Sequence, residues 1–256
     1  MSDESSRSGD CLSNWLTGIF NNCAERVRAS VREPCVLCGA AGVGGPLCNP
    51  CATGLPRLPE PSCVRCASPV TAGEICGTCL THPPRYDRVT AAYAYDFPVD
   101  ALIQAYKYGG ELRLARLLGR ALAHRASAAV DALVPMPLSV ERLRSRGYNQ
   151  ALELAREVGR VRGVPVWAHA CRRVIDTPAQ ALLPWRERPR NVLGAFVCDA
   201  DLAGLRVAVV DDVLTTGATL NELARNLRRA GAAEVHGWVA ARAVQRVYKR
   251  RDEDYE

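Results

Sequence analysis

The stretch VAVVDDVLTTGAT, residues 207–219, combines residue types that suit the binding of a sugar phosphate. Four apolar residues, typical of a buried strand, precede two adjacent carboxylates and a turn rich in Thr and Gly. Hydroxyls, a glycine that permits close backbone approach and the free N–H groups of a following helix can together bind a phosphate monoester. A capped strand-turn-helix would explain only one Asp and one Thr. The pattern therefore predicts a ribose 5-phosphate site.

The carboxylates and the turn are expected to bind different parts of that ligand. Like charges repel, so Asp211 and Asp212 would accept hydrogen bonds from ribose hydroxyls rather than contact the phosphate. Because neighbouring side chains of a strand point to opposite faces, at least one of the two is expected to lie in the turn. The phosphate would be bound by the turn itself, that is, by Thr215, Thr216, Gly217 and Thr219.

A second group of residues, with metal-binding chemistry, lies in the first third of the chain. Cys-x-x-Cys pairs there form two repeats, each with a gap of nine residues between its pairs. The repeats consist of Cys35, Cys38, Cys48 and Cys51, and of Cys63, Cys66, Cys76 and Cys79. Two such turns bring four thiolates to one zinc ion, so we predict about two structural zinc ions, each held within one repeat. Redox-active dithiols are the less favoured alternative, because no thioredoxin-like pattern accompanies them.

Composition limits the classes of protein to which the chain can belong. The sequence has no apolar run long enough to span a membrane and no signal-peptide pattern at its N-terminus, so a cytoplasmic protein without membrane insertion is expected. The formal net charge of +6 favours anionic partners such as phosphates, nucleotides or nucleic acid. Lys107, in YKYGG, could reach phosphate, but a surface lysine is the favoured interpretation. The remaining cysteines are expected to be packing residues: Cys11, Cys23, Cys171 and Cys198.

The chain divides into segments that differ in composition and in secondary-structure pattern. Residues 1–33 read as a polar tail followed by an amphipathic helix, and residues 34–84 as a Cys-rich segment too short to build a large apolar core. Residues 85–245 alternate between strand and helix patterns, with strands predicted at 87–97, in 131–137, at 164–174, at 206–212 and at 234–242. Such alternation predicts an α/β fold with a mainly parallel sheet flanked by helices. Residues 246–256 form a charged tail.

Several of these motifs resemble those of a known family. The stretch 207–219 resembles the phosphoribosyl-pyrophosphate (PRPP) binding motif of type I phosphoribosyltransferases. Together with VPMPLSVERLRSRGYNQALELA, TPAQALLPWRERPRNVLGAF and the cysteine repeats, it looks like the ComF family of competence-associated proteins, over residues 33–242. The resemblance implies a phosphoribosyltransferase domain, of the glycosyltransferase class, behind a double zinc ribbon. It also implies that Mg²⁺ accompanies PRPP, and that Ala218 belongs to the phosphate loop.

The resemblance further implies where pyrophosphate would bind. The loop after the first core strand, Pro135, Met136 and Pro137, would line it, with Arg146 nearby and Tyr148, Asn149 and Gln150 as polar lining. Arg142 and Arg144 fit this site and a solvated basic face about equally well. The loop 175–191 matches the mobile hood of type I phosphoribosyltransferases, or else is a disordered linker. Its candidate residues are Gln180, Arg186, Arg190 and Asn191, with Arg186 as a catalytic residue beside Asp211 and Asp212.

Two functions remain open from the sequence. One is an enzyme that transfers phosphoribose from PRPP to an acceptor that no motif identifies. The other is a non-catalytic module that senses PRPP or a nucleotide and binds single-stranded DNA or competence proteins through its basic surface and ribbons. No row of aromatic residues suited to base stacking is evident, which weakens the second possibility. The sequence gives no indication of oligomeric state.

Overall fold

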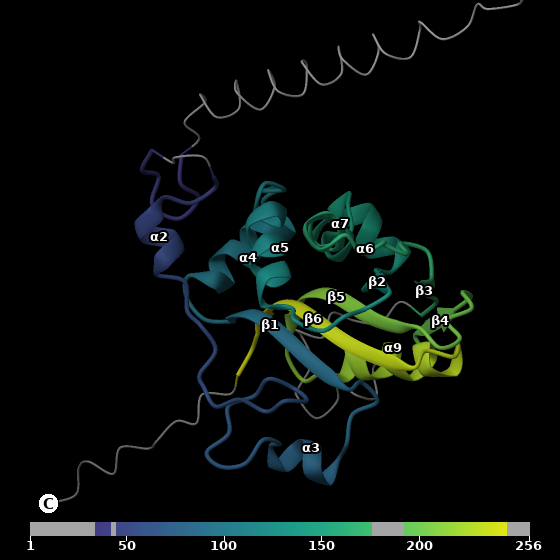
Figure 1. Ribbon diagram of the computed structural model, residues 1–256. Helices are drawn as coiled ribbons and strands as arrows, with labels where there is room; N and C mark the ends of the chain where they lie inside the picture. The colour runs from purple at the N-terminus through teal and green to yellow at the C-terminus, as the bar shows by residue number, and fades with distance from the viewer. Residues whose placement is uncertain (1–33, 42–44, 176–191, 245–256) are drawn as a thin grey trace, which may run out of the picture. The chain divides into compact units, whose positions relative to one another are not determined.

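The computed structural model describes residues 34–41, 45–175 and 192–244 (Figure 1). The expected N-terminal amphipathic helix, the hood segment from residue 176 to 191 and the charged tail lie outside these residues. The chain divides into two compact units, Met1–Gly54 and Leu55–Glu256. The first cysteine repeat thus belongs to the first unit, whereas the second repeat belongs to the same unit as the α/β elements.

The two cysteine repeats have the same local structure, as their equal spacing predicts. In each repeat an isolated antiparallel bridge flanks the first Cys-x-x-Cys turn, Pro34 to Ala41 in one and Ser62 to Pro69 in the other. The second pair of each repeat begins a five-residue helix, α2 (Asn49–Thr53) and α3 (Gly77–Thr81). Both helices are too short to be stable alone, so each repeat depends on its cysteines for order.

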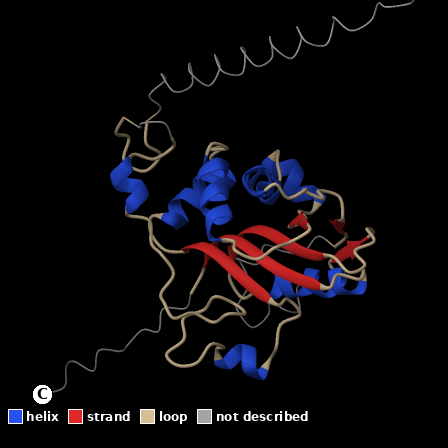
Figure 2. Cartoon of the chain, in the orientation of Figure 1, coloured by secondary structure: helices blue, strands red, loops and turns tan. Residues whose placement is uncertain are grey.

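A four-stranded parallel sheet forms the centre of the second unit (Figure 2). The strand order is β1-β6-β5-β2. The strands are β1 (Arg88–Ala94), β2 (Ala132–Pro135), β5 (Arg206–Leu214) and β6 (Glu234–Arg242). The two central strands are buried along most of their length, as is expected of a parallel sheet covered on both faces. The predicted mainly parallel α/β fold is confirmed.

Helices cover both faces of the sheet (Figure 1). One face carries α4 (Val99–Tyr108), α5 (Leu114–Arg125), α6 (Val140–Arg146) and α7 (Gln150–Arg162), and the other carries α9 (Ala218–Arg229). The side chain of Asn149 caps α7 by accepting from Ala151 N at 2.9 Å, and Gly163 ends the helix in the left-handed region. Within the described residues no helix is long and apolar enough to cross a membrane.

The strand predicted at 164–174 is mostly wrong. Only β3 (Cys171–Arg173) is a strand, and it pairs antiparallel with β4 (Phe196–Cys198) in a separate two-stranded sheet. The earlier part makes one isolated bridge, from Val166 to Leu133, and then turns away. Cys171 and Cys198 face each other across this small sheet and form a disulfide, although the sequence analysis expected packing residues.

Candidate phosphate and metal sites

Both carboxylates of the predicted site lie within strand β5. The expectation that at least one of them is in the turn is wrong, because β5 continues to Leu214. The neighbouring strand explains the extension: Val213 and Leu214 still pair with β6, opposite Ala241 and Arg242. Asp211 accepts a hydrogen bond from Asp212 N at 2.8 Å and is half-buried, whereas Asp212 is only 4% exposed.

Lys107, at the end of α4, forms an ion pair with this acidic strand end. Its Nζ lies 2.8 Å from Asp212 Oδ1, and its side chain is 20% exposed. Burial alone would lower the pKa of Lys107, but the Asp212 carboxylate outweighs that effect and raises it, so the lysine stays charged. The expectation of a surface lysine is therefore wrong. The signal that could have found it is the rarity of lysine in a chain whose other basic residues, except Lys249, are arginines.

The acid pair has unused hydrogen-bonding capacity. Asp212 Oδ2 is buried and has no hydrogen-bond partner in the described structure. A buried carboxylate oxygen accepts and does not donate, so it requires a donor such as a sugar hydroxyl. Burial, and then the neighbouring Asp212 charge, raises the pKa of Asp211 to about 7. The end of β5 is therefore an acceptor site with one open position.

The turn after β5 has the geometry of a phosphate loop. Gly217 adopts φ 81°, in the left-handed region, and α9 starts directly after it. The Thr216 hydroxyl accepts from Ala218 N at 3.2 Å. The N–H groups in the first turn of a helix have no partner within the helix, and α9 directs them toward Thr215–Gly217. Thr215, Thr216, Gly217, Ala218 and Thr219 thus surround one helix start, beside the two carboxylates.

The loop after β2 lies beside the acid pair at the C-terminal end of β5. Met136 N donates to Val210 O at 2.9 Å, directly before Asp211, and Pro135 and Pro137 are buried beside it. Asn149 Nδ2 donates to Met136 O at 3.1 Å and fixes this loop to the start of α7. The parallel register of β2 with β5 therefore brings the predicted pyrophosphate loop to the acid pair.

Arg146 also lies near the acid pair. Its guanidinium stacks over the Tyr108 ring at 5.1 Å from the centroid. It lowers the pKa of Asp211, although burial and Asp212 outweigh it. Tyr148 and Gln150 instead connect helices: the Tyr148 hydroxyl donates to Tyr106 O, and the Tyr106 hydroxyl donates to Gln150 O at 2.7 Å. These bonds hold the end of α4, and with it Lys107, against α7.

The residues predicted on the hood, Gln180, Arg186, Arg190 and Asn191, lie outside the described residues.

The eight cysteines of the repeats form two four-cysteine clusters. In each cluster the four sulfur atoms lie within 4.8 Å of one another. Cys38 Sγ and Cys48 Sγ are 3.6 Å apart, as are Cys66 Sγ and Cys76 Sγ. A tetrahedral zinc site with Zn–S bonds of about 2.3 Å has sulfur atoms about 3.8 Å apart, so both clusters fit zinc. Each cluster uses the cysteines of one repeat, in sequence order.

Comparisons with known proteins agree with this geometry. A family model described as a double zinc ribbon domain matches residues 32–80, and one described as a phosphoribosyl transferase domain matches residues 197–256. Competence protein F of Haemophilus influenzae is 34% identical over 62% of this chain and 74% of its own length. DNA utilization protein YhgH of Salmonella typhimurium is 31% identical over 91% of this chain and 93% of its own. The chain belongs to the family of these proteins.

Solved structures were also compared with this member of the Competence protein F family. Glutamine PRPP amidotransferase from B. subtilis is 21% identical, with a TM-score of 0.39, over 54% of this chain and 30% of that chain. Purine phosphoribosyltransferase from Pyrococcus horikoshii is 20% identical, with a TM-score of 0.30, over 52% of this chain and 74% of that chain.

Two residues that the sequence analysis missed lie between the second four-cysteine cluster and the phosphate loop. Arg242, at the end of β6, is 6% exposed, and Tyr86 is 4% exposed. An arginine that ends the otherwise apolar strand pattern of residues 234–242 was the available signal for Arg242. No sequence pattern indicated Tyr86, because its role depends on tertiary packing alone.

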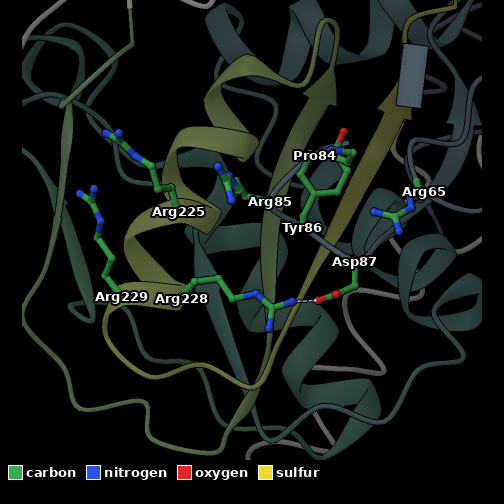
Figure 3. A pocket seen from close by; sticks show the side chains of 8 residues that line it. All are labelled: Arg65, Pro84, Arg85, Tyr86, Asp87, Arg225, Arg228 and Arg229. Carbon is green, nitrogen blue, oxygen red and sulfur yellow. Dashed lines mark hydrogen bonds and ion pairs between the residues drawn. The ribbon is translucent and has the colours of Figure 1, made fainter. Parts of the chain in front are cut away.

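A basic pocket of about 540 Å³ lies elsewhere on the second unit, along the C-terminal half of α9 (Figure 3). Its arginines are Arg65, Arg85, Arg225, Arg228 and Arg229. Arg228 is paired with Asp87, and Arg225 with Glu222 at 2.5 Å. Across the described ranges, the side chains of Arg65, Arg85 and Arg229 have no hydrogen bond or ion pair. The pocket therefore has a net positive charge.

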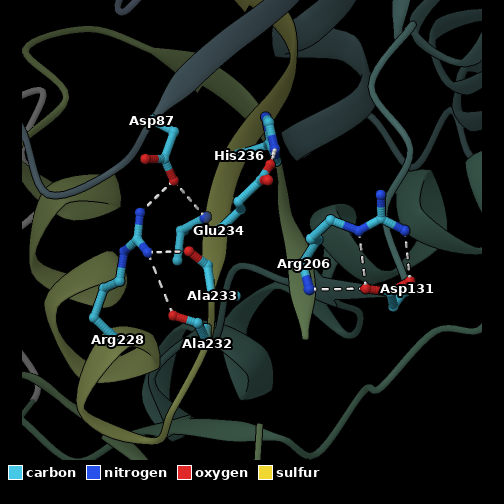
Figure 4. Close-up of polar contacts among 9 residues, drawn as sticks. Asp87, Asp131, Arg206, Arg228, Ala232, Ala233, Glu234 and His236 are labelled. Atoms are coloured by element: carbon cyan, nitrogen blue, oxygen red, sulfur yellow. Dashed lines mark hydrogen bonds and ion pairs between the residues drawn. The ribbon is translucent and has the colours of Figure 1, made fainter. Parts of the chain in front are cut away.

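This pocket lies toward the N-terminal ends of β1 and β6, where Asp87 pairs with Arg228 (Figure 4). Asp87 precedes β1 and accepts from Val235 N at 2.8 Å, where β6 begins. At the same ends of the strands, where β5 and β2 begin, Arg206 pairs with Asp131 at 2.9 Å. Since α9 runs antiparallel to the strands, its first residues adjoin the acid pair and its last residues adjoin the pocket. Tyr86, which lines the pocket, also lies against Gly217 of the phosphate loop, so the two sites adjoin at this residue.

Proposed function

We propose that this protein binds PRPP at the end of β5 and transfers its phosphoribosyl group to an acceptor, with release of pyrophosphate. The observation that carries the proposal is the open acceptor position of the buried Asp212 Oδ2, beside a loop that offers hydroxyls and a helix start. A ligand that fits both features combines a hydroxyl donor with a phosphate. A ribose 5-phosphate combines them, and type I phosphoribosyltransferases suggest PRPP in particular.

In the proposed complex the two carboxylates would hold the ribose and the loop from Thr215 to Thr219 would hold the 5-phosphate. Lys107, Arg146 and the backbone of the Pro135–Pro137 loop would face the pyrophosphate. Mg²⁺, a hard cation, would accompany PRPP through oxygen ligands and neutralise charge on the leaving group. The carboxylate of Asp211 is an oxygen donor that could reach such an ion.

The proposed reaction breaks the bond between the anomeric carbon and the pyrophosphate oxygen, and the electron pair leaves with pyrophosphate. A nitrogen of the acceptor then forms the new bond to that carbon, and its proton passes to the released pyrophosphate. The cationic groups of the site would stabilise the developing negative charge on the leaving group. The hood residues Gln180, Arg186, Arg190 and Asn191 are proposed to close over PRPP and exclude water. A cytoplasmic location is proposed because eight cysteines are arranged as metal-binding thiols, although Cys171 and Cys198 form a disulfide.

PRPP affinity tests this proposal. The double substitution Asp211→Asn and Asp212→Asn removes the negative charge but keeps the side-chain volume, so we expect the protein to fold and to lose measurable PRPP affinity in calorimetry with Mg²⁺. Asp131→Asn is the matched control, because this carboxylate lies at the opposite end of the strands, where β2 begins. Equal PRPP affinity in the double variant and the control would refute the ribose assignment. Pyrophosphate release with a panel of amine and base acceptors then tests turnover.

The arginine pocket favours a second candidate function, the binding of single-stranded DNA. We infer that Arg65, Arg85 and Arg229, which have no partner in the described structure, are placed to contact phosphates. Arg142 and Arg144, which also fit a solvated basic face, lie in α6 on the other face of the sheet. The arginines that α9 gives the pocket lie in its C-terminal half, and the PRPP site lies at its start, so we propose that DNA and PRPP occupy different places although Tyr86 lies beside both.

The salt dependence of DNA binding tests the second candidate. The logarithm of DNA affinity falls with the logarithm of salt concentration by a slope of about 0.7 for each phosphate neutralised on a single strand. We expect Arg85→Ala with Arg229→Ala to reduce this slope by about 1–2. Arg116→Ala with Arg162→Ala, exposed positions on α5 and α7, should leave it unchanged. Equal slopes in both variants would exclude the pocket, and displacement of DNA by PRPP would place it in the phosphate loop instead.

A further inference from the structure

The guanidinium of Arg242 connects the second cysteine repeat to the start of the phosphate loop. On the repeat, Nε donates to Cys66 O and one terminal nitrogen donates to Ser68 Oγ, both at 2.8 Å. On the loop, the other terminal nitrogen donates to Leu214 O at 3.0 Å and to Thr215 O. A guanidinium is planar and its donors have fixed directions, so it sets the distance between the two backbone segments that it joins.

The charge of Arg242 makes this connection sensitive to the state of the metal site. Among the described residues Arg242 has no ion pair, and its partners are carbonyl and hydroxyl groups. A buried cation is costly unless it is hydrogen-bonded or opposed by negative charge. Four thiolates around one Zn²⁺ leave a net negative charge on a four-cysteine site. The zinc-loaded second site therefore supplies a compensating charge for Arg242 that protonated thiols would not supply.

Tyr86 makes a second, independent connection. A Cβ added to Gly217 would lie 3.0 Å from the Tyr86 hydroxyl oxygen, so this buried phenol lies directly against the left-handed residue of the loop. Tyr86 is also near Cys66 and Cys79: its pKa is raised by burial first and by these two cysteines next. The phenol ring thus fills the space between the cysteine cluster and the loop.

The packing of the repeat agrees with these contacts. Ala67, which follows Cys66 and has a φ of 56°, is 5% exposed and belongs to the same apolar core as Tyr86, Leu214 and Leu220. The first repeat belongs to the other compact unit, Met1–Gly54. Two repeats with equal spacing in sequence thus differ in their relation to the phosphate loop.

We propose that the second four-cysteine site supports the phosphate loop, with Arg242 and Tyr86 as positioning residues, so that metal binding at Cys63–Cys79 and ligand binding at residues 215–219 are thermodynamically coupled. This inference rests on the proposed function only for the identity of the ligand. Coupling is reciprocal: metal at the second site raises the affinity of the loop for its ligand, and bound ligand raises the affinity of that site for metal by the same factor. The first four-cysteine site, in the other compact unit, provides the control for this coupling.

Hydrogen exchange tests the structural half of this proposal without any ligand. In full-length protein with both sites filled with zinc, the amides of Ala218, Asn221 and Ala243 report on the loop, because their acceptors are Thr216 Oγ1, Gly217 O and Leu214 O. We expect Cys66→Ser to speed exchange of these amides about tenfold or more. Cys38→Ser, the equivalent change in the first repeat, should leave their rates unchanged. Equal effects of the two substitutions would overturn the proposal.

A variant that keeps all eight cysteines covers the possibility that Cys66→Ser fails to fold. Arg242→Lys retains the positive charge but removes the fork that reaches both segments. We expect this variant to retain zinc at both sites, to exchange the loop amides faster, and to bind PRPP with Mg²⁺ about 5–150-fold more weakly in calorimetry. Unchanged exchange rates in Arg242→Lys would also overturn the proposal.

Metal loss tests the reciprocal half. In an equilibrium titration of wild-type protein with a chromogenic chelator, zinc should transfer in two steps, and saturating PRPP should move one of them to a higher chelator concentration. The step that PRPP moves should be the one lost in Cys66→Ser and kept in Cys38→Ser. If the exchange results hold but PRPP binds to no form of the protein, the proposed ligand is wrong while the support of the loop stands. If PRPP binds and neither step moves, the coupling is refuted.

Discussion

Asp211 is a carboxyl whose ionisation opposes folding. Burial, and then the charge of Asp212 beside it, raises the pKa of Asp211 to about 7 in the folded protein. In an unfolded chain an Asp titrates near pH 3.9, so between about pH 4 and 7 the folded state holds a proton that the unfolded state lacks. Stability contributed by this proton is complete below about pH 4 and is lost as the pH rises through about 7.

Thermal unfolding measured against pH checks this effect. We expect Asp211→Asn to be more stable than wild type at pH 8 by about 1–3 kcal/mol, because the amide carries no charge to desolvate, and to differ little at pH 4. Asp131→Asn is the control of opposite sign: its hydrogen bond with Arg206 lowers the pKa of Asp131 to about 2, so that carboxylate stabilises the fold above about pH 4. A stability difference for Asp211→Asn that is the same at pH 4 and pH 8 would contradict the assignment.

At the scale of elements, the end of α4 determines the charge balance of the site. Tyr106 is fully buried and its hydroxyl bonds to Gln150 O, so the last turn of α4 is fixed against α7. Lys107, one residue on, is thereby held at Asp212. A helix end positioned by its neighbour, rather than a residue on the binding loop, supplies the cation of the site.

Replacing Lys107 separates its structural and binding roles. Lys107→Gln leaves Asp212 buried without a cation, so we expect a loss of about 2–4 kcal/mol of stability and weaker PRPP binding. Lys107→Arg keeps the charge and should retain most of both. In a double-mutant cycle by denaturant unfolding, Lys107→Gln should cost far less when Asp212 is Asn. Additive costs in that cycle would show that the ion pair does not contribute to stability.

Sequence patterns predicted the elements that local chemistry defines. The apolar run before Asp211 correctly predicted a buried strand, and the Thr and Gly residues after it predicted the turn and the start of α9. Two expectations failed where a neighbouring strand decides the outcome. Strand β5 runs past both carboxylates because β6 continues beside it, and most of 164–174 is not a strand because Val166 finds only one bridge to Leu133.

For the site, the sequence predicted the groups that contact ligand better than the groups that hold them. Asp211, Asp212 and the loop residues share one short motif, so their proximity follows from the chain itself. Lys107, Tyr86 and Arg242 come from three distant segments, and no local pattern relates them. Their roles depend on tertiary packing, which spacing along one chain does not encode.

At the scale of the whole molecule, the two units and their two four-cysteine clusters show that a repeat in sequence need not be a repeat in role. The cysteine spacing is the same, yet one cluster is in Met1–Gly54 and the other packs with the parallel sheet. The acid pair and the arginine pocket, in turn, lie toward opposite ends of the strands of that sheet. One α/β unit thus presents an acceptor site at the start of α9 and a cationic site along the C-terminal half of that helix.

The contacts of Arg242 have a consequence for how the two repeats can evolve. The turn at Cys66–Ser68 must present a carbonyl and a hydroxyl to that guanidinium as well as thiolates to a metal, so a substitution there has to satisfy two neighbours at once. A segment that must keep contacts to two neighbours therefore accepts fewer substitutions than a segment that keeps contacts to one. A change in the turn at Cys35–Gly39 meets the demands of its own small unit, whereas the same change in the second copy would need a compensating change in strand β6.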